Sequence, residues 1–98
     1  MTITGKLYII RNMINNMVYI GCTTNSLKQR FNEHVKSTYD KMKNKRILYR
    51  HMRMYGYRNY HIELIDEYRC DSLHEIRQKE SEIIKYYKNL GNCYNIRN

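Results

Sequence analysis

The spacing of apolar and polar residues predicts a β-hairpin at the start of the chain. Residues 7–11 alternate in part and are rich in strand-forming side chains, and residues 17–22 have the same character. Between them, Asn15 and Asn16 tolerate left-handed backbone and favour a turn. We therefore expect two antiparallel strands, the second of which ends at Gly21.

Two helices are predicted after the hairpin. The first covers residues 27–37, and N-cap oxygens are offered by Thr24, Asn25 and Ser26. At about 100° per residue, its apolar face carries Leu27, Phe31, His34 and Val35. The second helix lies in the basic segment 41–58 and is expected to end at Gly56 with a left-handed C-cap. Its apolar stripe is formed by Ile47, Leu48, Met52 and Tyr55.

A third strand is predicted over residues 60–65, and a third helix follows it. Ser72 and Glu75 form a capping-box pattern, which predicts a helix that begins there and runs to about residue 88. The apolar arc of this helix consists of Leu73, Ile76, Ile83, Ile84 and Tyr87.

The end of the chain completes the predicted fold. Gly91 stops the last helix, and residues 93–96 are expected to return to the sheet edge. The element order is therefore ββ-α-α-β-α. It predicts an α/β fold of the α+β type, in which three helices flank a small three-stranded antiparallel sheet.

Length and charge narrow the class of protein. The chain has 98 residues and a formal net charge of +9. We expect a single domain over residues 1–98, with a polyanion as its partner. An anionic membrane is the competing partner, but no basic amphipathic stretch has a broad apolar face. With neither a membrane-spanning run nor a leader visible, we expect an intracellular protein, in the cytoplasm or in a nucleus or viral factory.

Composition limits what single residue types can indicate. Cys22, Cys70 and Cys93 are odd in number and far apart, which excludes a zinc site of the CxxC type and argues against a disulfide framework. The chain has 11 tyrosines but no tryptophan or proline, a bias that an AT-rich genome would produce. A tyrosine is therefore informative only where other residues support it.

Glu80 is the sharpest candidate for chemistry. It falls near the middle of the apolar arc of the third helix, whereas Glu82 falls on the polar side. A buried carboxylate without a partner costs several kcal/mol. Glu80 could therefore form a buried salt bridge, or it could bind a divalent metal such as Mg²⁺ together with water and a substrate phosphate.

Four further residues form a candidate group. Arg30 and His34 lie one helical turn apart, where they could grip a phosphate and hold a proton-transfer network. Tyr8 and Tyr19 lie on the two hairpin strands beside them. Each of the four also has a purely structural interpretation, as a packed, hydrogen-bonded or solvated side chain.

Six segments in order match a known pattern. They are Lys6-Leu7-Tyr8, Val18-Tyr19-Ile20-Gly21, and residues 27–34, 54–62, 80–87 and 91–95. Through these six segments, the chain resembles the GIY-YIG nuclease domain family over nearly its whole length. One departure is that Lys6 occupies the first glycine position, with Gly5 one place early.

The resemblance implies a metal-dependent DNA endonuclease. Glu80 would bind Mg²⁺ or Mn²⁺, and Arg30 would bind the phosphate. Tyr8, helped by His34, would deprotonate or orient the attacking water, unless a metal-activated hydroxide does this work. Tyr19 would position water or substrate, and Asn95 would form a hydrogen bond in the site.

The basic segment is the expected contact with DNA. The side chains that would follow the sugar-phosphate backbone are Lys41, Lys43, Lys45, Arg46, Arg50, Arg53 and Arg58. They could equally form an ordinary solvated surface. The rival function is a catalytically inactive, basic nucleic-acid-binding module. One active site cuts one strand at a time, so a homodimer or a separate DNA-targeting partner is a further expectation.

Overall fold

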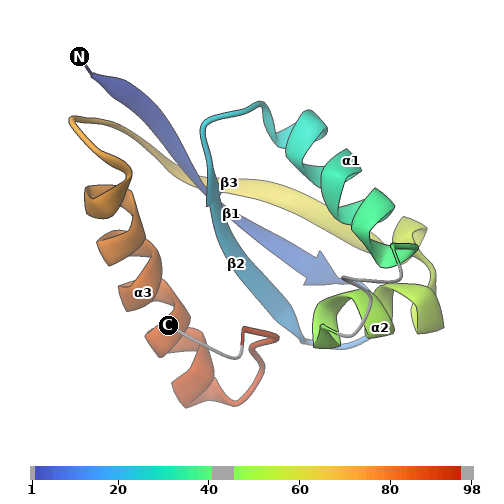
Figure 1. The fold of residues 1–98 in the computed structure, drawn as a ribbon. Coiled ribbons are helices and arrows are strands. Elements are labelled where there is room, and N and C mark those ends of the chain that lie inside the picture. The colour runs from blue at the N-terminus through green and yellow to red at the C-terminus, as the bar shows by residue number, and fades with distance from the viewer. Residues whose placement is uncertain (1, 41–45, 96–98) are drawn as a thin grey trace.

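The computed structural model describes residues 2–40 and 46–95, and it confirms the predicted fold class and element order (Figure 1). The described residues form three strands, three α-helices and one 3₁₀ turn. In chain order, the elements are β1 (Ile3–Asn12), β2 (Val18–Thr23), α1 (Leu27–Thr38), α2 (Ile47–Tyr55), the 3₁₀ turn η1 (Tyr57–Asn59), β3 (Tyr60–Cys70) and α3 (Leu73–Leu90).

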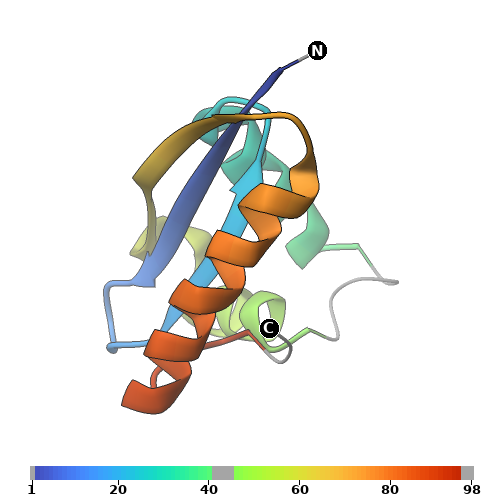
Figure 2. The same cartoon turned by 90° about the vertical axis from the view of Figure 1, so that its left-hand side faces the viewer.

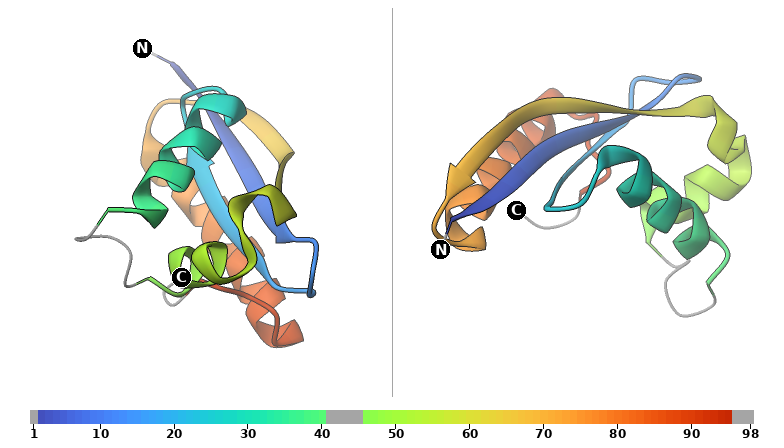
Figure 3. Two further views of the ribbon diagram at one scale, coloured as in Figure 1. Left: turned by 90° about the vertical axis from the view of Figure 1, so that its right-hand side faces the viewer. Right: turned by 90° about the horizontal axis from the view of Figure 1, so that it is seen from above.

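The sheet has the order β2-β1-β3, and both neighbours of β1 run antiparallel to it. Helices cover both faces of the sheet. Figure 2 shows α3 in front of the strands with α1 and α2 behind them, and the left view of Figure 3 shows the reverse arrangement. The sheet is therefore the middle layer of three, and β1 is its central strand.

The two-sided burial of β1 explains its sequence. Tyr8 and Ile10 pack on the side of α1 and α2, whereas Leu7 and Ile9 pack on the side of α3. A strand buried on both faces has a continuous apolar run instead of strict alternation. This is why residues 7–10 alternate only in part. The predicted apolar face of α1 is confirmed, because its residues join the cluster around Tyr8.

The strands are longer than predicted. β1 begins at Ile3, and β3 continues to Cys70, because Ile3 pairs with Cys70 at the far end of the sheet. The β1–β3 register shifts between Leu7 and Tyr8. This long-range pairing extends β3 through its polar second half, Asp66 to Arg69, which local apolar patterning does not mark as strand.

The hairpin turn differs from the prediction. No non-glycine residue in the described part of the chain has a positive φ, so Asn15 and Asn16 do not adopt left-handed backbone. Asparagine side chains hold the turn instead. The Asn12 Oδ1 accepts the N–H of Ile14 at 2.9 Å, and the Asn15 Oδ1 accepts the N–H of Met17 at 2.9 Å. Asparagine favours turns because its side chain can replace a backbone acceptor.

The helix ends agree in part with expectation. Ser26 caps α1 by accepting the N–H of Gln29. Gly91 ends α3, as predicted, and its backbone lies in the left-handed region. Gly56 has a positive φ of 84°, but its ψ of 132° lies outside the left-handed helical region, so that part of the prediction is wrong.

The capping box at α3 is also wrong. The Ser72 side chain makes no capping hydrogen bond. The Glu75 carboxylate instead accepts the N–H of Asp71 at 3.1 Å.

After α3, the chain returns to the sheet edge, as predicted, through an isolated parallel bridge between Val18 and Cys93. Residue 96, the end of the predicted segment, lies outside the described range. Within the described residues, no helix has both the length and the apolar character to cross a bilayer.

Candidate active site

Tyr8 is placed by the strand pairing of the hairpin. It lies opposite Gly21 in the β1–β2 register, and its ring crosses the β2 backbone at that glycine. A Cβ at position 21 would overlap the end of the Tyr8 ring and its hydroxyl. Gly21 is therefore required by close approach. Lys6 is paired with Thr23 on one side and with Glu67 on the other, and its φ is not positive. A lysine in place of the glycine of the family pattern therefore creates no backbone strain at this position.

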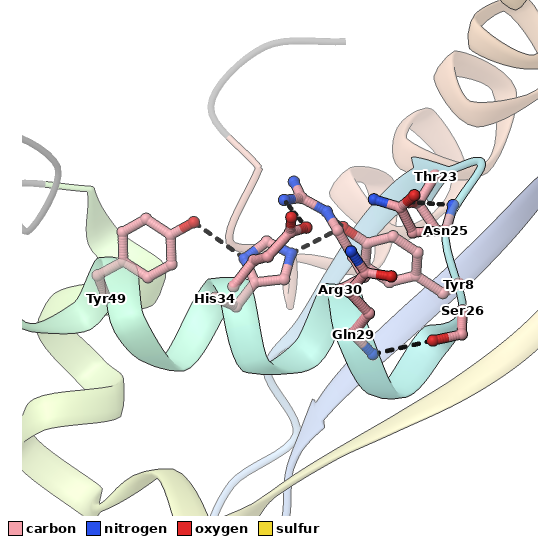
Figure 4. Close-up of polar contacts among 9 residues, drawn as sticks. Tyr8, Thr23, Asn25, Ser26, Gln29, Arg30, His34 and Tyr49 are labelled. Atoms are coloured by element: carbon pink, nitrogen blue, oxygen red, sulfur yellow. Dashed lines mark hydrogen bonds and ion pairs between the residues drawn. The ribbon is translucent and has the colours of Figure 1, made fainter.

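A continuous hydrogen-bond network connects Tyr8 to α1 and α2 (Figure 4). The Tyr8 hydroxyl lies 2.7 Å from Nε2 of His34. The Arg30 Nε–H donates to the same hydroxyl at 3.1 Å. On the other side of the imidazole, Nδ1 of His34 lies 2.9 Å from the Tyr49 hydroxyl. The structure thus brings together Tyr8, Arg30 and His34, as the sequence predicted, and adds Tyr49.

Burial keeps Tyr8 and His34 in this network uncharged. Tyr8 and His34 are both fully buried. Burial, together with the positive charges of Arg30 and Arg46, lowers the pKa of His34 to about 3. Burial also raises the pKa of Tyr8, although Arg30 partly opposes this effect. At neutral pH the protein without substrate therefore holds a phenol and an uncharged imidazole.

Tyr19 lies beside this network on β2. Its ring centroid is 6.5 Å from that of Tyr8 and 5.4 Å from that of His34. Burial raises the pKa of Tyr19, and the nearby Tyr49 and Glu80 add to the increase while Arg30 opposes it. The two tyrosines predicted from the hairpin thus lie on one side of the sheet, facing α1.

Glu80 approaches the site from the other layer. It lies between the buried Ile76 and Ile84 on α3, which confirms its place on the apolar stripe, but its side chain is partly exposed instead of fully buried. Burial and a hydrogen bond to the Glu80 carboxylate raise the pKa of Cys22 to about 12. Because Cys22 is on the edge strand β2, Glu80 lies at the edge of the sheet, close enough to affect Tyr19.

The surroundings of Glu80 fit a metal ion held by few protein ligands. Within the described residues, Glu80 forms no ion pair with a lysine or an arginine. In the same part of the chain, no group of three or more His, Cys, Asp or Glu side chains could hold a metal. Mg²⁺ commonly keeps several waters and takes one or two carboxylates plus substrate phosphates. A single, partly exposed carboxylate suits that mode of binding.

Asn95 contacts the edge of β2. Its Nδ2 donates to the carbonyl of Ile20 at 2.8 Å, and its Oδ1 accepts the N–H of Ile20 at 2.9 Å. The side chain therefore pairs with the backbone next to Tyr19. This geometry holds the C-terminal segment against β2 and supports the strand that carries Tyr19.

The basic segment is described only in part. Lys41, Lys43 and Lys45 lie outside the described residues. Arg46, Arg50, Arg53 and Arg58 are exposed on or next to α2. The charge of Arg46 reaches both His34 and Tyr19. The basic surface of α2 therefore begins at the candidate site.

Two neighbours of the site were not singled out from the sequence. Tyr49 precedes the buried Met52 by three residues, so its helical spacing could have placed it on the inner face of α2. Nothing in the sequence indicates that His34 is its partner. Cys22 is the other neighbour, and its contact with Glu80 depends on how α3 crosses the sheet. All three cysteines are free.

The fold and the arrangement of these side chains together point to a small catalytic domain. A buried tyrosine–histidine–arginine network lies between a carboxylate and a basic helix, at the edge of a sheet covered on both faces. The chain belongs to the GIY-YIG catalytic domain family, whose sequence profile matches residues 5–95. Membership of this family indicates a nuclease.

Two viral proteins are similar to this chain. A putative MSV199 domain-containing protein, 146R, from Invertebrate iridescent virus 6 is 33% identical over 91 residues, which cover 92% of this chain and 36% of that protein. The uncharacterized protein 019R from the same virus is 28% identical over 87 residues, or 89% of this chain and 30% of that protein. The chain thus spans about a third of the length of these relatives. No solved structure matches it significantly.

Proposed function

We propose that this chain is a metal-dependent DNA endonuclease that hydrolyses phosphodiester bonds with a single divalent ion at Glu80. The observation that supports this most strongly is the buried contact of Tyr8 with His34 and Arg30, together with the partly exposed Glu80 carboxylate, whose charge reaches the adjacent Tyr19. A module that only binds phosphate would need neither the buried imidazole of His34 nor the Glu80 carboxylate.

Glu80 would hold Mg²⁺ or Mn²⁺, together with water and oxygens of the substrate phosphate. When bound, the ion would polarise the scissile phosphate and stabilise the leaving 3′ oxygen. The half-buried Arg30 would neutralise negative charge on the phosphoryl oxygens. Its planar guanidinium suits two phosphate oxygens better than an ammonium group does.

Tyr8 would deprotonate or orient the attacking water, and Tyr19 would help to position it. The Tyr8 hydroxyl has no exposed surface, and Arg30 donates a hydrogen bond to it. Water would therefore reach Tyr8 once Arg30 shifts its hydrogen bonds towards the phosphate. This shift would expose a lone pair of the phenol oxygen.

His34 would receive the proton that Tyr8 releases. Its Nε2 is 2.7 Å from the hydroxyl, within proton-transfer distance. In the free protein, the charges of Arg30 and Arg46 help to keep the pKa of His34 low. Substrate phosphates beside these arginines would offset both charges and raise the pKa of His34. Proton transfer would then be easier in the substrate complex than in the free protein.

The exposed arginines of α2 would bind the DNA backbone on either side of the scissile phosphate. We include Arg46, Arg50, Arg53 and Arg58 in this surface, together with the preceding lysines Lys41, Lys43 and Lys45. A single domain over residues 1–98 would cut one strand at a time. A homodimer or a separate DNA-targeting partner would supply the second cut or the choice of target.

The test compares cleavage of supercoiled, linear, single-stranded and branched DNA in Mg²⁺, in Mn²⁺ and in EDTA. Wild-type protein should nick DNA only with a metal present. Glu80→Gln should lose cleavage and keep the fold, as judged by circular dichroism. Glu82→Gln is the matched control, because Glu82 is exposed on the same helix two residues away and should retain cleavage.

Two results would refute the proposal. Normal turnover by Glu80→Gln would remove the carboxylate from the mechanism. DNA binding without cleavage under every metal condition would instead show the rival function, a basic binding module.

A further inference from the structure

Tyr49 is a buried residue of α2 whose contact with His34 has no assigned role. Only 4% of its surface is exposed, although its hydroxyl needs a polar partner. That hydroxyl lies 2.9 Å from Nδ1 of His34, on the side of the imidazole opposite Tyr8 (Figure 4). Tyr8, His34 and Tyr49 thus form one line of hydrogen bonds through the core.

The fully buried Tyr8 hydroxyl favours one direction for these hydrogen bonds, because its O–H needs an acceptor inside the protein, whereas Tyr49 keeps 4% of its surface exposed. A neutral imidazole has one N–H donor and one acceptor nitrogen. Within the described residues, the hydrogen-bonded neighbours of the Tyr8 hydroxyl are the Arg30 Nε–H, which can only donate, and Nε2 of His34. The O–H of Tyr8 has an acceptor only if Nε2 carries no proton. In that case the proton of His34 lies on Nδ1 and is donated to the oxygen of Tyr49.

We propose that Tyr49 is a positioning residue that holds His34 in the Nδ1–H tautomer and so keeps Nε2 ready to accept a proton from Tyr8. This inference rests on the proposed nuclease function. The same logic operates wherever a third group orients a catalytic histidine by accepting its second N–H.

During hydrolysis, protons would move from water to Tyr8 and from Tyr8 to His34. The water oxygen forms a bond to phosphorus, and its proton passes to the oxygen of Tyr8. The original proton of Tyr8 passes to Nε2 of His34, which becomes an imidazolium. The bond from phosphorus to the 3′ oxygen breaks, and the leaving 3′ oxygen takes a proton from solvent. His34 later returns the Nε2 proton to Tyr8, which releases one to solvent.

Removal of the Tyr49 hydroxyl would weaken the preference for the Nδ1–H tautomer. The Nδ1–H would be buried without an acceptor, which is unfavourable. Moving the proton to Nε2 relieves this, because Nε2–H can donate to the oxygen of Tyr8, but it leaves the Tyr8 O–H without an acceptor. Both tautomers would therefore be populated. The chain can still fold, but the proton path is blocked in the molecules that carry the proton on Nε2.

The decisive measurement is the ¹⁵N NMR spectrum of histidine-labelled protein, because the shifts of the two ring nitrogens distinguish the tautomers. The His34 signals are identified by their absence from His34→Gln. We expect the Nδ1–H tautomer in the wild type and a change towards Nε2–H in Tyr49→Phe. Tyr60→Phe is the matched control, since Tyr60 is a buried tyrosine of the same apolar cluster whose hydroxyl contacts Asn12 and Tyr94.

The kinetic measurement uses the same variants. Tyr49→Phe should lower kcat in proportion to the loss of the Nδ1–H tautomer seen in its spectrum, with KM little changed, because only that tautomer accepts the proton of Tyr8. Tyr60→Phe should change neither kcat nor the His34 spectrum. A general loss of packing would instead affect both variants alike.

Two outcomes would overturn the inference. One is an Nε2–H tautomer in the wild type, which needs no variant and decides the matter even if Tyr49→Phe does not fold. The other is a folded Tyr49→Phe that keeps the wild-type kcat. If wild-type protein cleaves no DNA, the nuclease proposal fails, and the spectra still decide whether Tyr49 sets the tautomer of His34.

Discussion

Replacement of His34 should remove a large part of the acid sensitivity of this fold. His34 is fully buried and neutral, and it is faced by Tyr8 from β1, Tyr19 from β2, Arg30 from α1, and Arg46 and Tyr49 from α2. In the unfolded chain the imidazole protonates at its ordinary pKa. In the folded chain burial and the two arginines lower that pKa to about 3.

The sign of the effect follows from proton binding. Between the folded and unfolded pKa values, the unfolded state binds more protons than the folded state, so the free energy of unfolding rises with pH. The contribution of His34 is fully present above about pH 6.5 and is lost as the pH falls towards about 3. Between pH 8 and pH 5 the expected loss is about 2 kcal/mol.

The assay is urea unfolding followed by circular dichroism at pH 8, 6 and 5. For wild-type protein, the contribution of His34 corresponds to a fall in the urea concentration at the unfolding midpoint of about 1 M between pH 8 and pH 5. His34→Gln is the comparison, because it removes the titrating group while the other ionisable groups remain. Between pH 8 and pH 5, its free energy of unfolding should fall by about 2 kcal/mol less than that of the wild-type protein. Equal pH dependence in the two proteins would refute the burial and charge argument for His34.

Two other substitutions test the geometry of the site and its basic surface. Gly21→Ala should displace the Tyr8 ring, lower the free energy of unfolding by about 1–3 kcal/mol and reduce cleavage by about 100-fold or more. Gly5→Ala is the control, because its added Cβ meets the Ile76 side chain instead. This variant should be less stable without a comparable loss of kcat. Equal losses of kcat in the two variants would contradict the role of Gly21. Arg50→Gln should weaken DNA binding and reduce the slope of the logarithm of the binding constant against the logarithm of the salt concentration by about 1. Arg69→Gln, a change of an exposed residue on β3, should leave this slope unchanged. An unchanged slope for Arg50→Gln would show that its side chain does not contact the DNA.

Much of the fold could be predicted because its elements carry local signals. The stripe of α1 and the stop at Gly91 follow from helical periodicity and from the conformational freedom of glycine. The boundaries of β1 and β3 could not be predicted, because those strands extend only as far as they pair with each other. The cap at Ser72 failed for a related reason, since Glu75 found a different backbone donor at Asp71.

The candidate site divides in the same way. Tyr8, Tyr19, Arg30 and His34 could be placed together, because a hairpin and the helix that follows it are neighbours in both sequence and space. The expectation of a deeply buried Glu80 was too strong, because periodicity assigns a residue to a helix face but does not say whether the sheet edge covers it. Glu80 lies where β2 ends the sheet, and it is therefore partly exposed.

The sequence by itself determined the order of the elements, the family, and which side chains are available for chemistry. These properties depend on short-range periodicity and on residue types in a specific order. Only the tertiary structure decided that α3 lies on the opposite face from α1 and brings Glu80 to the edge of β2, and that the Tyr49 hydroxyl meets His34. Those contacts depend on how separate elements cross a twisted sheet, and no local pattern encodes a crossing.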